Sequence, residues 1–214
     1  MPKKNNENLI IGSNYVKVLI FSHGLGDDPS SWLFFANEIK KDIKNIKIIL
    51  TKSPIIPVSV NNNLEMPGWF DIKKMPIDTN HSLHESYDYI DNSVEIIHDL
   101  INQEKINPDK IFLGGFSQGA SLSLQAGLKY KYKLGGIIVL SGWLIDSSMM
   151  NHNDTPIFIG HGTKDDIVKY ENSKVSYDLL KYKTSLISLK SYENMKHSVS
   201  VKERYDVIDW INKY

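Results

Sequence analysis

The chain of 214 residues contains no cysteine. This absence excludes disulfide bonds, zinc sites built from thiolates and a cysteine nucleophile, and it removes S-palmitoylation as a membrane anchor. Long apolar runs are also missing, because no stretch is long enough to span a bilayer. The charged start MPKKNN has no apolar segment behind it that would mark a signal peptide. We therefore expect a cytoplasmic protein without a stable membrane anchor.

Net charge is absent as well, since 25 basic residues balance 25 acidic ones. No basic stripe suggests nucleic acid as a partner, and no acidic block suggests a solvating tail. The length suits one domain with a full hydrophobic core, and neither a repeat nor a linker divides the chain. We expect a single domain over residues 1–214.

Apolar runs typical of strands alternate with amphipathic stretches typical of helices. The expected strands cover 15–23, 45–50, 110–115, 135–142, 156–162 and 184–192. The expected helices cover 30–43, 84–103, the residues after Ser117, 170–182 and 200–214. This alternation predicts an α/β fold in which a mostly parallel central sheet carries helices on both faces.

One long segment, 51–83, shows little periodicity and contains Pro54, Pro57, Pro67 and Pro76. Long irregular loops in compact domains are usually functional or disordered. We expect this segment to be irregular and to border the active site.

The stretch KIFLGGFSQGASLSLQ (110–125) places Ser117 between Gly115 and Gly119, where an expected strand meets an expected helix. The pattern G-x-S-x-G in that context is typical of a nucleophile elbow, in which glycines relieve crowding at a sharp turn. The alternative is an ordinary glycine-rich turn. The strand-to-helix context favours Ser117 as a nucleophile.

A serine nucleophile needs a histidine base, and a carboxylate that orients the base. In this fold class the chain order is serine, acid, histidine. His152 lies in a polar loop and His161 precedes the nearest acids, so His197 is the expected base. The acid is Asp165 or Asp166.

Spacing from the Gly162 turn favours Asp165 as the acid, and Asp166 would then cap the following helix. Acyl transfer also requires N–H groups that bind the oxyanion. The N–H of Gln118, directly after the nucleophile, and that of Leu25, between Gly24 and Gly26, are the expected donors. His23 fits better as a buried histidine that braces this loop.

The motifs HGLGD, MPGWFDI, GGFSQGA, LSGWL, HGTKDDIV and NMKHS occur in this order between residues 23 and 198. Together they resemble the acyl-protein thioesterase and carboxylesterase family of α/β-hydrolases. The resemblance implies a triad of Ser117, Asp165 and His197, with Leu25 and Gln118 as oxyanion donors. The choice of Asp165 over Asp166 rests mostly on this resemblance. We expect no cofactor and no metal.

Members of that family hydrolyse thioesters of acyl chains on proteins, lysophospholipid esters or small carboxylic esters. A long acyl chain needs an apolar groove, whereas the same apolar residues are equally typical of an ordinary core. The candidates for the groove are Pro67, Trp69, Phe70, Ile72, Trp143, Ile167 and Val168.

The chain departs from the family pattern at Gly68, where serine is common, and at Asn194, where glycine is usual. Asparagine tolerates positive φ better than most residues, so the turn at Asn194 can form. The stretch 73–84 replaces the usual acidic loop and carries Lys73, Lys74, His81 and His84. The two histidines fit a solvated loop far better than a metal site.

The leading hypothesis is therefore an acyl-protein thioesterase that acts on an acylated protein. The alternative is a general carboxylesterase or lysophospholipase, and an inactive hydrolase fold that only binds is a weaker third. Exposed apolar residues near the groove would allow a homodimer, an expectation that rests on analogy alone.

Overall fold

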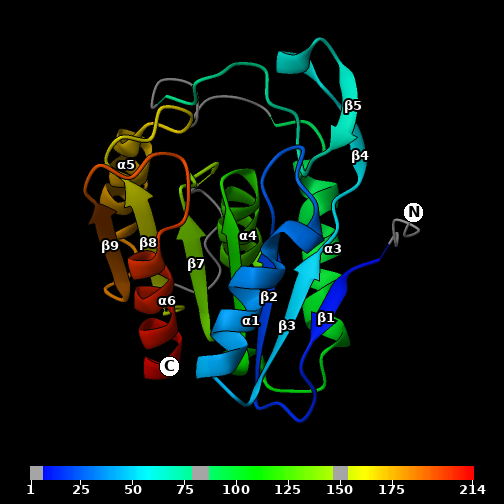
Figure 1. Cartoon of the computed structure of the whole chain (residues 1–214), viewed down its shortest axis with the longest axis vertical. Coiled ribbons are helices and arrows are strands. Elements are labelled where there is room, and N and C mark those ends of the chain that lie inside the picture. The colour runs from blue at the N-terminus through cyan, green and yellow to red at the C-terminus, as the bar shows by residue number, and fades with distance from the viewer. Residues whose placement is uncertain (1–6, 79–86, 147–153) are drawn as a thin grey trace.

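The structure, a computed structural model, describes residues 7–78, 87–146 and 154–214. Its centre is a seven-stranded sheet with the order β1-β3-β2-β6-β7-β8-β9 (Figure 1). All neighbouring strands are parallel except β1, which pairs antiparallel with β3 at one edge. The strands are β1 (Leu9–Ile11), β2 (Lys17–Ser22), β3 (Ile46–Thr51), β6 (Ile111–Phe116), β7 (Gly136–Leu140), β8 (Ile157–Gly162) and β9 (Ile187–Tyr192).

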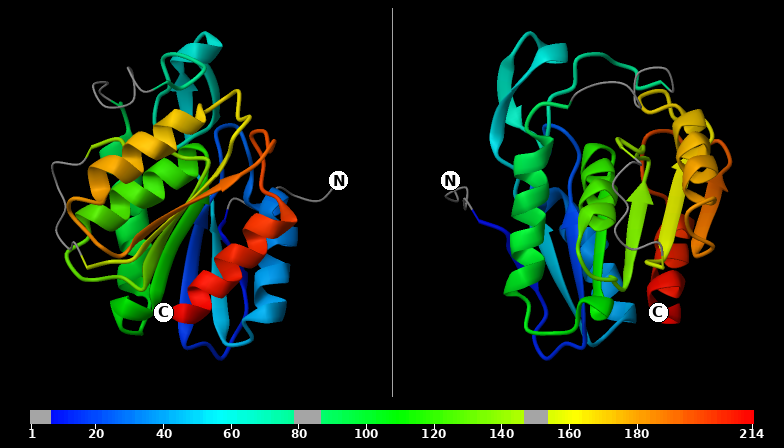
Figure 2. Two further views of the ribbon diagram at one scale, coloured as in Figure 1. Left: turned by 90° about the vertical axis from the view of Figure 1, so that its left-hand side faces the viewer. Right: turned by 180° about the vertical axis from the view of Figure 1, so that it is seen from behind.

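Helices cover both faces of this sheet (Figure 2). One face carries α1 (Leu33–Asp42) and α6 (Val201–Lys213), and the other carries α3 (Ile90–Gln103), α4 (Gln118–Lys129) and α5 (Tyr170–Leu180). The expected α/β architecture is thereby confirmed. No helix among the described residues is both long enough and apolar enough to cross a bilayer.

The sheet order places one crevice at the carboxyl ends of β2 and β6. These two strands are neighbours, with Ser22 opposite Gly115, yet the chain runs from β2 outward through β3 before it returns to β6. Ligands of open α/β sheets bind at such a reversal of strand order. The loop after β2 and the turn after β6 therefore meet at the point where a site is expected.

The turn after β6 depends on close backbone packing between α4 and β2. A Cβ atom on Gly119 would overlap the carbonyl oxygens of Ser22 and His23, which belong to backbone and cannot rotate away. Glycine at position 119 therefore lets the start of α4 lie against the end of β2.

The segment 51–83 is more regular than expected. Its described part contains an antiparallel hairpin of β4 (Ile55–Val58) and β5 (Leu64–Pro67), so the expectation of an irregular loop was wrong there. Pro57 lies within β4, where a sheet of only two strands leaves every strand an edge that tolerates proline. Asn62 and Asn63 adopt positive φ in the connecting turn, a conformation that asparagine tolerates.

A buried carboxyl group lies between α6 and β8. Glu203, in the first turn of α6, is fully buried, and neither of its side-chain oxygens has a hydrogen-bond partner among the described residues. Its Oε1 occupies the space beside Gly160 of β8. Burial raises the pKa of Glu203 to about 8, with Asp206 adding to the effect.

We predict that Gly119→Ala destabilises the fold by more than about 2 kcal/mol, because the methyl group displaces backbone rather than a flexible side chain. Urea unfolding measures the change. Gly24→Ala is the matched control, since a Cβ at Gly24 meets only ordinary van der Waals contacts. Equal unfolding midpoints for the two variants would contradict the packing argument.

We also predict that Glu203 contributes a decrease in the free energy of unfolding between pH 4.5 and 7, read as the difference between wild type and Glu203→Gln because the lowered pKa of His23 acts in the opposite direction. The unfolded chain ionises Glu203 in this range while the folded chain keeps it neutral, so the unfolded state binds fewer protons. The expected decrease is on the order of 3 kcal/mol. Glu203→Gln should remove it, whereas Glu171→Gln, an exposed first-turn glutamate of α5, should not. A Glu203→Gln variant with the wild-type pH slope would refute the assignment.

Candidate active site

Ser117 joins β6 to α4 in a strained backbone conformation, with φ 55° and ψ −122°. Such an outlier costs of order 1–3 kcal/mol and persists only where the surroundings enforce it. The Ser117 N–H donates to Leu140 O of β7, and Ser117 O accepts from the N–H groups of Ala120 and Ser121. A Cβ on Gly115 would overlap Gly119, so the glycines permit this sharp turn, as the sequence predicted.

The loop after β2 passes directly beside this turn. A Cβ built on Gly24 would lie 3.5 Å from the Cβ of Ser117. Among the described residues, neither the N–H of Leu25 nor that of Gln118 has a hydrogen-bond acceptor. Two unpaired donors close to a serine hydroxyl are what an oxyanion hole requires.

The side chain of Gln118 ties this turn to the loop after β5. Its Oε1 accepts from Trp69 N–H at 3.0 Å, and its Nε2 donates to Phe70 O at 2.6 Å. The indole Nε1 of Trp69 donates to His23 O at 2.9 Å. These bonds hold three loops around Ser117.

His23 braces the same loop, as expected. It is buried, its Nδ1 donates to Gly24 O at 2.7 Å, and its ring contacts that of Trp69. Burial lowers its pKa, so the ring is neutral at pH 7. Its Nε2 has no partner among the described residues.

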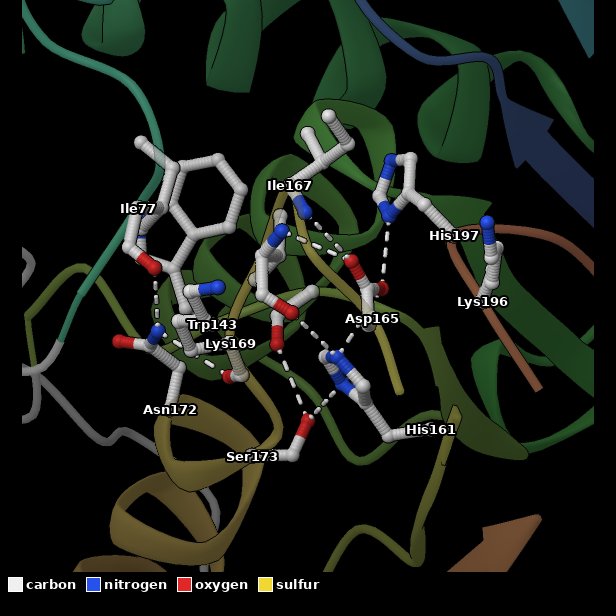
Figure 3. Close-up of polar contacts among 12 residues, drawn as sticks. Ile77, Trp143, His161, Asp165, Ile167, Lys169, Asn172, Ser173, Lys196 and His197 are labelled. Atoms are coloured by element: carbon white, nitrogen blue, oxygen red, sulfur yellow. Dashed lines mark hydrogen bonds and ion pairs between the residues drawn. The ribbon is translucent and has the colours of Figure 1, made fainter. Parts of the chain in front are cut away.

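His197 and Asp165 meet at the carboxyl ends of β8 and β9 (Figure 3). His197 Nδ1 donates to Asp165 Oδ2 at 2.7 Å, and Asp165 Oδ1 accepts from the N–H groups of Ile167 and Val168. Burial by itself would raise the pKa of Asp165, but hydrogen bonds from His161 and His197 outweigh it and hold the pKa well below its usual range. The carboxylate is therefore ionised where it faces the imidazole.

His161 lies behind the acid rather than beside the serine. Its Nε2 donates to Val168 O at 2.8 Å and lies 3.2 Å from Asp165 Oδ2, while its Nδ1 contacts Ser173 Oγ (Figure 3). Sequence reasoning considered His161 only as a rival base and missed this supporting contact. The signal was the spacing of four residues between His161 and Asp165.

The imidazole of His197 also approaches the serine turn. The ring of Phe116, the residue before Ser117, lies 4.6 Å from the His197 ring between centroids. Asn194 adopts φ 58° in the preceding turn, so asparagine replaces the usual glycine without loss of that conformation. Sequence reasoning did not single out Phe116.

The role expected for Asp166 was wrong. Asp166 is exposed, whereas α5 begins at Tyr170 and its N-cap residue is Lys169. Asp166 therefore does not cap this helix. The turn 165–168 is instead closed by Asp165, whose own side chain accepts the N–H groups that a cap would satisfy.

Most of the residues expected to line an acyl groove are core residues in this structure. Five of them are 0–1% exposed and belong to one buried cluster: Trp69, Phe70, Ile72, Trp143 and Val168. Pro67 is half-buried and Ile167 is exposed. His81, His84 and His152 lie outside the described residues.

The chain is similar to known proteins over most of its length. Residues 11–214 match the model of the phospholipase/carboxylesterase family. Acyl-protein thioesterase 1 of Gibberella zeae is 39% identical, over 94% of this chain and 92% of that protein, and its namesake of Yarrowia lipolytica is 35% identical over 93% and 92%.

Among solved structures, SOBER1 of Arabidopsis thaliana superposes with a TM-score of 0.86 at 31% identity, over 92% of this chain and 98% of that one. The family match spans nearly the whole chain, and the relatives cover it to the same extent. The chain belongs to the phospholipase/carboxylesterase family of α/β-hydrolases, and it is a serine hydrolase.

Proposed function

We propose that this serine hydrolase is an acyl-protein thioesterase whose catalytic triad is Ser117, Asp165 and His197. The observation that carries the proposal is the 2.7 Å bond between His197 Nδ1 and the buried Asp165 carboxylate, while the His197 ring contacts Phe116, the residue before a serine in strained conformation. A carboxylate in that position fixes the tautomer of the base, so that Nε2 is free to take the serine proton.

The reaction then proceeds in two halves. His197 Nε2 takes the proton of Ser117 Oγ as this oxygen attacks the thioester carbonyl, and the N–H groups of Leu25 and Gln118 stabilise the oxyanion. The imidazolium gives its proton to the leaving thiolate sulfur, and the acyl group remains on Ser117. Water then attacks the acyl-enzyme as His197 takes its proton, and the imidazolium returns this proton to Ser117 Oγ as the carboxylic acid leaves.

The substrate class follows from the relatives, two of which carry the name acyl-protein thioesterase 1. We propose an acylated protein as the substrate and the cytoplasm as the location, which suits a chain without cysteine. A general carboxylesterase would share every catalytic residue, because the triad does not determine which acyl-chain length is preferred. Only the response to acyl length separates the two activities.

Ser117→Ala should abolish labelling by a fluorophosphonate probe, since the probe needs the activated hydroxyl. Wild type should label and should hydrolyse long-chain acyl thioesters more efficiently than acetyl thioesters, as measured by kcat/KM over an acyl-length series. Labelling that persists in Ser117→Ala would refute the nucleophile. A clear preference for acetyl substrates would favour the carboxylesterase instead.

Asp165→Asn should lower kcat about 10³- to 10⁴-fold, because an amide can hold His197 in the wrong tautomer. Asp166→Asn is the matched control and should stay within about twofold, since Asp166 is an exposed neighbour of the same charge. Steady-state kinetics with one thioester gives both values. Equal losses in the two variants would contradict Asp165 as the orienting acid.

A further inference from the structure

A pocket of about 340 Å³ opens between the start of α1 and the start of α6. We call it the α1–α6 pocket. The two helices lie side by side on one face of the sheet (Figure 1). The residues that line it are Asp27, Ser31, Trp32, Phe34, Phe35, Val199, Ser200, Val201 and Arg204.

The pocket adjoins the candidate base. Val199 in its wall follows His197 by two residues along the chain. The ring of Phe116 bridges the remaining distance, since its centroid lies 4.6 Å from that of His197 and 5.3 Å from that of Trp32. One aromatic ring thus separates the imidazole from the pocket wall.

This location corresponds to the leaving-group side of the substrate. A triad histidine returns its proton to the leaving atom, so the leaving group must lie against the imidazole. In a thioester of a protein cysteine, the leaving group is the cysteine with its flanking residues. A residue two or three positions from that cysteine lies about 7–10 Å away along an extended chain, which is enough to pass the Phe116 ring.

The lining favours an apolar side chain. Of the apolar residues that line the pocket, Phe34 is 70% exposed, Val201 is 61% exposed and Trp32 is half-buried. Exposed apolar side chains that border a pocket are typical of a binding site.

The charges favour a cationic neighbour over a phosphate. Arg204 is the only cation among the described residues that line the pocket, and its Nη2 lies 3.2 Å from Glu38 Oε2. Its guanidinium also lies over the ring of Phe34. The carboxylate of Asp27 accepts hydrogen bonds from two neutral donors, the Trp32 indole and the Asp28 N–H. A phosphate would find Arg204 already paired with Glu38 and would be repelled by the Asp27 carboxylate.

We propose that the α1–α6 pocket binds the protein part of the substrate, taking an apolar side chain two or three residues from the acylated cysteine, with a lysine or arginine next to it. This inference rests on the proposed thioesterase function. The pocket then selects the protein that is deacylated, independently of the groups that hold the acyl chain.

The test measures binding separately from turnover. The probe is a fluorescent peptide with an amide-linked acyl chain, which the enzyme cleaves far more slowly than a thioester, and with Leu-Lys two residues after the acylated position. Its Kd by anisotropy should weaken about tenfold in Phe34→Ala, as for truncation of a central aromatic contact. Tyr182→Ala is the matched control, because Tyr182 is 84% exposed, follows the end of α5 by two residues and does not line the pocket.

Charge is tested with the same probe. Replacing its lysine by glutamate should weaken wild-type binding, and Asp27→Asn should reduce this difference. The pocket proposal would be overturned if Phe34→Ala bound the probe with the wild-type Kd. It would also be overturned if Tyr182→Ala weakened binding as much as Phe34→Ala does. Displacement of the probe by glycerophosphocholine as effectively as by the deacylated peptide would overturn it too.

The two proposals fail in different ways. If wild type hydrolyses no acyl thioester, the thioesterase function is refuted whatever the Kd values are. If it hydrolyses thioesters and the Kd differences are absent, the function stands and the pocket is refuted.

Discussion

The site depends on one backbone constraint, the approach of α4 to the ends of β2 and β6 through glycine. Because Gly115 and Gly119 have no side chain, the helix begins within contact of both strands, and Ser117 is left with φ 55° between them. The strain, of order 1–3 kcal/mol, is offset by the bonds that Ser117 makes to β7 and to α4. Among the described residues the same turn leaves the Gln118 N–H without an acceptor at the start of the helix, so the proposed nucleophile and the proposed oxyanion donor arise from a single local geometry.

A second constraint acts on the acid. Asp165 is buried, and a buried carboxylate is stable only when donors surround it. Two backbone N–H groups bind one oxygen, and the imidazoles of His197 and His161 face the other. His197 is thus held by a group that is itself fixed by β8 and by the following turn. The orientation of His197, the proposed base, is therefore fixed by the turn 165–168 through Asp165.

Sequence alone supplied candidates for the parts of the site whose residue types are restricted by chemistry. Glycine on both sides of Ser117 and the chain order serine, acid, histidine selected Ser117 and His197 as the proposed nucleophile and base. Roles that depend on burial were harder to predict, because Trp69 and Val168 are equally apolar whether they line a groove or fill a core. The hairpin 55–67 was missed because a proline, Pro57, within a run of residues argues against a strand. The cap expected at Asp166 is absent because the side chain of Asp165 accepts the N–H groups of its own turn.

The burial of these aromatic residues bears on where specificity resides. Trp69, Phe70 and Trp143 fix the loops around Ser117 through packing and through Gln118, so they set the geometry of catalysis and present almost no surface to a substrate. Exposed apolar surface instead occurs at Phe34 and Val201, in the wall of the α1–α6 pocket. Binding energy from remote parts of a substrate can be used to orient the reacting bond. A leaving group anchored next to the base would be held where the proton must be delivered, so selection of the substrate and catalysis would share one contact.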